Sequence, residues 1–92
     1  MQKVQKDGEA SYMLDDVTEK IVRVLLENPA IPYNKSQLAE AAGVSRNALY
    51  RRWGTLQRYE LVEEADVGAK GTYWTLDADS PAADALTRLL YG

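Results

Sequence analysis

The chain has 92 residues, of which 46% are hydrophobic, and its formal net charge is −3. A chain of this length forms one small domain with a core that is only just sufficient, and its composition differs from that of a disordered chain. It contains no cysteine and no histidine, which excludes disulfides, thiolate metal sites and the commonest general base of enzymes. We therefore expect no enzymatic activity, no cofactor and no metal site.

The N-terminal residues are polar and show no periodicity, so residues 1–14 are predicted to form a tail or arm ahead of a domain over residues 15–77. They lack the apolar centre of a signal peptide, and no apolar run in the chain is long enough to cross a bilayer. We expect a cytoplasmic protein without a membrane partner.

The first predicted helix begins near Asp16, which forms a pair with Glu19 at the spacing of a capping box. Pro29 ends this helix, and Pro32 favours a short extended piece over residues 31–33. Apolar residues recur at the spacing of one helix face, at Val17, Ile21, Val24 and Leu25.

Two further helices are predicted on either side of a tight turn. The first, roughly 35–42, is capped by Asn34, and Gly43 supplies the backbone freedom for the turn. Ser45 then caps a helix over about 46–59. Its apolar side consists of Leu49, Trp53 and Leu56, and its opposite side of Asn47, Tyr50, Arg51, Gly54 and Arg58.

Beyond residue 60 the apolar period changes from that of a helix to alternation. Residues 61–66 and 72–76 are predicted strands, joined by a reversal that contains two glycines. Ser80 and Pro81 open a last helix within residues 78–92. The predicted fold class is therefore α+β and mostly α, with a two-stranded hairpin and a C-terminal helix. Its core is expected to include Leu25, Leu38, Leu49, Trp53, Leu56 and Trp74.

Positive charge is concentrated in one predicted helix. Residues 45–59 contain four arginines and no acidic residue, so this segment has a charge of +4. The rest of the chain therefore sums to −7, the difference between −3 and +4. A positive patch on a negative body indicates one directed anionic partner rather than indiscriminate coating of nucleic acid.

The segment QLAEAAGVSRNALYRR has the pattern of a helix-turn-helix, with the small residue Ala39 where two helices cross and Gly43 in the turn. With LQRYELVEE, which leads into the hairpin, it resembles the winged helix-turn-helix transcription regulators, broadly those of the MarR and PadR families. The resemblance covers residues 16–76. The chain departs from it at Glu60, where such proteins often have glycine, and at Arg52, a position that is often apolar.

This resemblance implies that the helix over 45–59 is a recognition helix in the major groove, and that residues 67–71 are a wing on the DNA backbone or in the minor groove. Arginine pairs well with guanine and asparagine with adenine. The predicted function is sequence-specific binding of double-stranded DNA by a small transcriptional regulator, with a repressor favoured. Such a protein is expected to be associated with the nucleoid. The DNA-binding residues expected on this basis are Asn34, Lys35, Ser36, Ser45, Arg46, Asn47, Tyr50, Arg51, Arg52 and Lys70.

Several alternatives stay open. Winged helices also serve as protein-interaction modules, which the acidic surface favours, and a plasmid or virus centromere or origin binder is a related possibility. Arg52 and Arg58 could equally neutralise nearby acidic residues or contact phosphate. Lys70 could be a solubilising hairpin tip as well as a DNA contact.

A homodimer is predicted from the two ends of the domain. The last helix has apolar residues on more than one face, and residues 12–14 offer a second apolar patch. The alternative is that both segments close the small core within one chain. No small-molecule effector is predicted. The residues expected at the dimer interface are Tyr12, Leu14, Leu86, Leu89 and Leu90.

Overall fold

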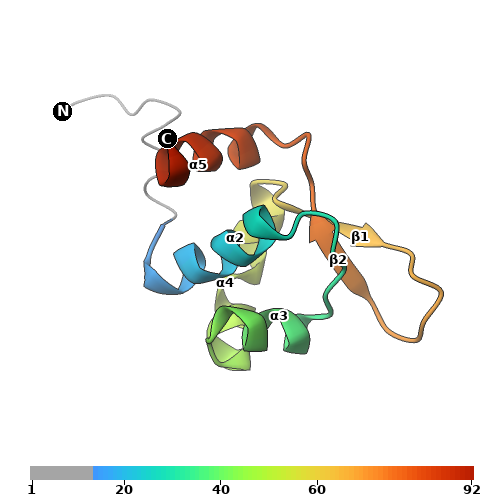
Figure 1. The fold of residues 1–92 in the computed structure, drawn as a ribbon. Helices are drawn as coiled ribbons and strands as arrows, with labels where there is room; N and C mark the ends of the chain where they lie inside the picture. The colour runs from blue at the N-terminus through green and yellow to red at the C-terminus, as the bar shows by residue number, and fades with distance from the viewer. Residues whose placement is uncertain (1–13) are drawn as a thin grey trace.

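The computed structural model describes residues 14–92 (Figure 1), so Tyr12 and the rest of the predicted tail before Leu14 lie outside the described residues. In the described part the chain forms four helices and one two-stranded antiparallel hairpin. This confirms an α+β fold that is mostly helical. The elements are α2 (Asp16–Glu27), α3 (Lys35–Ala42), α4 (Arg46–Arg58), β1 (Val62–Ala65), β2 (Tyr73–Leu76) and α5 (Pro81–Tyr91).

The cap of helix α2 differs from the prediction by one residue. Asp15, not Asp16, is the N-cap, because its side chain accepts a hydrogen bond from the backbone N–H of Thr18 at 2.7 Å. Asp16 is already helical and forms an ion pair with Lys20 at 3.4 Å. The buried face is also turned slightly from the predicted stripe, and it consists of Thr18, Ile21, Val22 and Leu25.

The turn between α3 and α4 is built as its residues predict. Asn34 and Gln37 form a reciprocal capping box, with N···O distances of 2.8 and 3.0 Å. Gly43 ends α3 in the left-handed region, with φ of 72°, which a residue without Cβ adopts at low cost. Ser45 then caps α4 by accepting a hydrogen bond at 3.0 Å from the backbone N–H three residues on. The chain therefore ends α3 at Ala42 and begins α4 at Arg46.

The extended segment between α2 and α3 pairs with the hairpin. Strands β1 and β2 pair antiparallel with Val62 opposite Leu76. Tyr33 forms an isolated bridge with Trp74, through backbone hydrogen bonds of 2.9 and 2.8 Å. Glu60, just before β1, has a φ of 58°. Glycine, which has no Cβ, adopts this left-handed conformation at a lower cost than glutamate does.

The core lies where α2, α3, α4 and α5 meet β1 and β2. The predicted core leucines, at positions 25, 38, 49 and 56, are at most 1% exposed, and Trp53 is 6% exposed. Trp74 differs from the prediction because it is only half-buried; it contacts Trp53 edge to face, with ring centroids 5.1 Å apart.

Helix α5 packs on its own chain and lies beside α2 (Figure 1). At its start, the buried Ser80 hydroxyl donates to the backbone carbonyl of Tyr59 at 3.0 Å. At its end, the Tyr91 hydroxyl donates to the carboxylate of Glu27 at 2.6 Å, and the Arg23 guanidinium lies 5.3 Å from the centre of the Tyr91 ring. Both ends of α5 are therefore attached to the domain.

This packing corrects part of the predicted dimer interface. Leu86 is fully buried within its own chain and has no surface to offer a second copy. Leu14 and Leu90 are half-buried against the same core, whereas Leu89 is 48% exposed. Much of the broad apolar stripe of the last helix is thus used within one chain, because a short chain needs this helix to complete its core.

Candidate nucleic-acid interface

Helix α4 has one buried and one outward face, divided as its sequence predicts. Leu49, Trp53 and Leu56 are buried on one side. The outward face holds only uncharged or basic residues, since α4 contains no acidic side chain. All of the residues predicted for this face are exposed, namely Asn47, Tyr50, Arg51, Gly54 and Arg58, and Arg46 is exposed at the helix start.

The arginines of α4 differ from those of the neighbouring helices in their partners. Arg23 of α2 pairs with Glu19 at 2.9 Å, and Arg88 of α5 pairs with Asp84 at 2.8 Å, each one turn away. Within residues 14–92, no carboxylate forms an ion pair with three of the arginines of α4, which are Arg46, Arg51 and Arg58.

The fourth arginine of α4, Arg52, has a distant acidic partner. Its Nε and Nη2 atoms both lie 2.6 Å from Oδ2 of Asp15, the N-cap of α2. Burial acts to raise the pKa of Asp15, but hydrogen bonds from Thr18 and Arg52 together outweigh it and hold the pKa below its ordinary value. The predicted DNA contact Arg52 is therefore engaged in an ion pair in the free protein.

The start of α3 lies next to the middle of α4. The Lys35 ammonium is 4.7 Å from the ring centre of Trp53 and 5.6 Å from that of Tyr50, so two aromatic faces orient it. Beside it is a shallow hollow of about 300 Å³ between α3, α4 and β2. The structure thus brings together four of the predicted site residues. The hollow is lined by Asn34, Lys35, Ser36, Tyr50, Thr72 and Trp74.

Thr72 and Trp74 are the lining residues that sequence reasoning missed. They reach the site because Tyr33 pairs with Trp74 and draws the hairpin against the start of α3. The signal in the sequence was the extended piece around Pro32. The sequence does not show which strand this extended piece pairs with, because that depends on how the whole chain folds.

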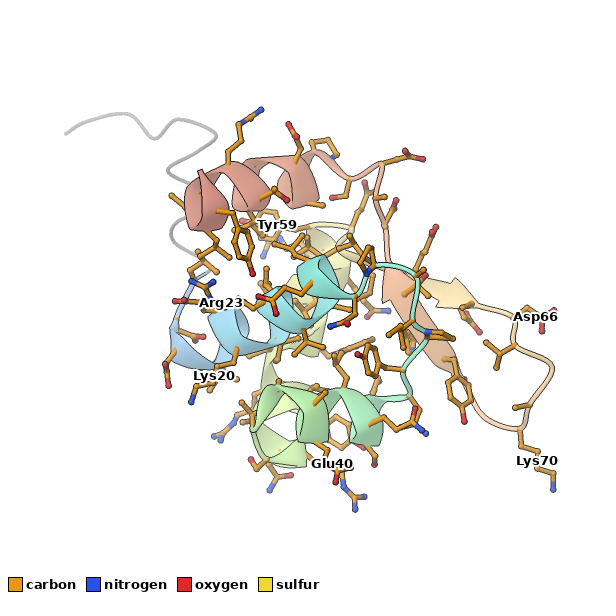
Figure 2. The ribbon with its side chains drawn as sticks, viewed as in Figure 1. Lys20, Arg23, Glu40, Tyr59, Asp66 and Lys70 are labelled. Carbon is orange, nitrogen blue, oxygen red and sulfur yellow. The ribbon has the colours of Figure 1, made fainter. Side chains whose placement is uncertain are left out.

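Lys70 is exposed at the outer end of the hairpin, where Figure 2 shows it projecting away from the helices. The same hairpin also has exposed acidic side chains at Glu63, Glu64 and Asp66. Lys70 is therefore the basic end of an otherwise acidic projection.

Two structural features are absent from residues 14–92. None of the helices there has the length and apolar character needed to cross a membrane. The same residues contain no group of three or more histidine, cysteine, aspartate or glutamate side chains arranged to hold a metal ion.

Comparison with protein-family models and with curated proteins finds no match to this chain. Its function must therefore be inferred from the fold, the outward face of α4 and the residues that flank it.

Proposed function

We propose that this protein is a sequence-specific double-stranded DNA-binding protein of the winged helix-turn-helix class, and within that class a small transcriptional repressor of the cytoplasm. The observation that supports this is the outward face of α4, where exposed arginine, asparagine and tyrosine side chains occur with no acidic residue on the helix. Arg23 and Arg88 on the other helices have carboxylate partners. Arg46, Arg51 and Arg58 of α4 have no such partner within residues 14–92, so no ion pair there accounts for their charge.

In this proposal α4 is the recognition helix and lies in the major groove. Arg46 and Asn47 are in its first turn, the part of such a helix that contacts base edges. Arg51 lies on the same outward side and can donate two hydrogen bonds to guanine. Gly54 keeps that side narrow, and a Cβ added there would meet no atom of residues 14–92 within 4 Å.

The residues around the start of α3 would bind the DNA backbone. Ser36 is exposed, and the backbone N–H groups of a helix start favour a phosphate. Lys35 is held near them by the faces of Trp53 and Tyr50. Lys70, at the tip of the wing formed by β1 and β2, would contact the backbone or the minor groove of a neighbouring turn.

A homodimer remains part of the proposal, because two copies about a two-fold axis read a longer site than one recognition helix. The exposed Leu89 on α5 is the described residue best placed to contribute to it. Sedimentation at micromolar concentration would measure the mass, and a monomer with and without its DNA would contradict the dimer.

The alternative function is a winged-helix protein-interaction module. The observation that favours it is the acidic hairpin, where Glu63 and Glu64 are both exposed on β1. Salt dependence separates the two, since DNA binding weakens steeply with salt whereas an adaptor need not. A centromere or origin binder would share the DNA contacts, and the neighbouring genes would distinguish it from a repressor.

The first experiment is selection of duplexes from a random pool, followed by titration of the selected duplex by fluorescence anisotropy. Arg51→Ala is expected to cost about 1–3 kcal/mol on that duplex and to relax the preference at one base pair. Arg88→Ala is the matched control, because it removes the same charge from the distant helix α5. An equal effect of both variants would contradict base recognition by α4.

A second variant tests the wing. Lys70→Ala is expected to weaken all duplexes alike and to flatten the slope of log affinity against log salt by about 0.9. Absence of any enriched duplex, together with no binding at low salt, would rule out the proposed function.

A further inference from the structure

The ion pair between Asp15 and Arg52 joins the start of α2 to α4, 37 residues along the chain. The carboxylate uses both of its oxygens. Oδ1 accepts the backbone N–H of Thr18 at 2.7 Å and so caps α2, while Oδ2 receives the guanidinium at 2.6 Å. Asp15 therefore has one bond that supports the fold and another that engages the proposed DNA-binding helix.

This ion pair is accessible to water. The side chain of Arg52 is 33% exposed and that of Asp15 is 47% exposed. An ion pair with this much exposure contributes little to stability, so a competing anion can replace the carboxylate at small cost. A phosphate offers an arginine the same arrangement of oxygen acceptors as a carboxylate does.

We propose that Asp15 is a built-in competitor for Arg52, which occupies the guanidinium in the free protein and lowers the affinity of α4 for DNA. When a duplex docks, Arg52 exchanges the carboxylate of Asp15 for a backbone phosphate. Asp15 is thus a residue that sets the strength of DNA binding without contacting DNA. The inference rests on the proposed function.

The exchange explains why Arg52 differs from the rest of α4. The other three arginines of α4 have no carboxylate partner within residues 14–92 and need break no ion pair there to meet an anion, whereas Arg52 must first leave Asp15. The sequence left two roles open for Arg52. In this proposal it neutralises an acid in the free protein and contacts phosphate in the DNA complex.

Asp15→Asn is the direct test, because asparagine caps a helix as well as aspartate does but has no charge. The variant is expected to bind the selected duplex up to about fivefold more tightly, the upper limit for release of an exposed ion pair. The slope of log affinity against log salt should stay close to that of the wild type, because Arg52 contacts the same phosphate in both complexes. Asp16→Asn is the matched control, since Asp16 is adjacent and pairs with Lys20 instead.

The same substitution in a protein that already lacks Arg52 shows whether Asp15 acts through Arg52. In Arg52→Ala protein, the further change Asp15→Asn is expected to alter affinity no more than Asp16→Asn does. Thermal melting of each variant checks that α2 and its cap stay folded. If Asp15→Asn matches Asp16→Asn in affinity, or weakens binding at an unchanged melting temperature, the inference is overturned.

The same titrations include Arg51→Ala, which keeps the two proposals apart. If Arg51→Ala weakens the selected duplex and Asp15→Asn does no more than its control, the competitor role alone fails. If no variant or wild-type protein binds a duplex, the proposed function fails and the competitor role with it.

Discussion

Helices α4 and α5 follow the same local rules and yet present different surfaces. Each begins after a serine N-cap and buries a leucine completely. On α5 the cap Ser80 is buried, and Arg88 has the carboxylate of Asp84 one turn away. On α4 the cap Ser45 is exposed, and the outward arginines have no acidic partner among the described residues. The arginine of α5 thus has a partner within its own helix, whereas the outward arginines of α4 are available to the DNA that we propose as the partner.

The largest expected effect is on the free energy of unfolding, and it distinguishes the buried face of α4 from its outward face. Leu49→Ala should lower the free energy of unfolding by about 2–5 kcal/mol, because the side chain is completely buried between helices. Asn47→Ala, two residues away on the exposed side, should change it by no more than about 0.5 kcal/mol. Urea denaturation measures both values. Similar losses in the two variants would show that the outward face also supports the fold.

The two serine caps provide the next comparison. Ser80→Ala should cost about 1–3 kcal/mol, because it removes the donor to the Tyr59 carbonyl and the acceptor for the N–H of Ala83 in a buried place. Ser45→Ala should cost about 1 kcal/mol or less, since water can replace an exposed cap. Thermal unfolding of the two variants shows which one loses more stability. A larger loss in Ser45→Ala would contradict the distinction between a buried cap on α5 and an exposed cap on α4.

The smallest expected effect on stability concerns a glycine within α4. Gly54→Ala should stabilise the protein by up to about 1 kcal/mol, because the added Cβ meets no atom of the described residues within 4 Å and alanine favours a helix. The same variant should bind the selected duplex more weakly if this face approaches DNA. The control is Gly43→Ala, which should destabilise by about 1–2 kcal/mol because of its φ of 72°. Unchanged DNA affinity in the Gly54 variant would remove this part of α4 from the interface.

Local chemistry explains why much of the fold could be predicted. Helix caps at Asn34, Ser45 and Ser80 involve partners within three residues, and the turn at Gly43 depends on one backbone angle. Such signals are contained in a short window of sequence. The prediction was wrong for the cap of α2, which is Asp15 and not Asp16. The two aspartates are adjacent and have equal capping propensity.

The sequence alone determined the order and type of the elements and the division of α4 into apolar and cationic sides, since both follow from periodicity. Only the tertiary structure decided which distant groups meet. Asp15 reaches Arg52 across 37 residues, and Tyr33 pairs with Trp74. The core likewise takes in Leu86 instead of leaving it for a second copy. These contacts depend on how whole helices pack, because a side chain selects its partner from what the folded chain brings within a few ångströms.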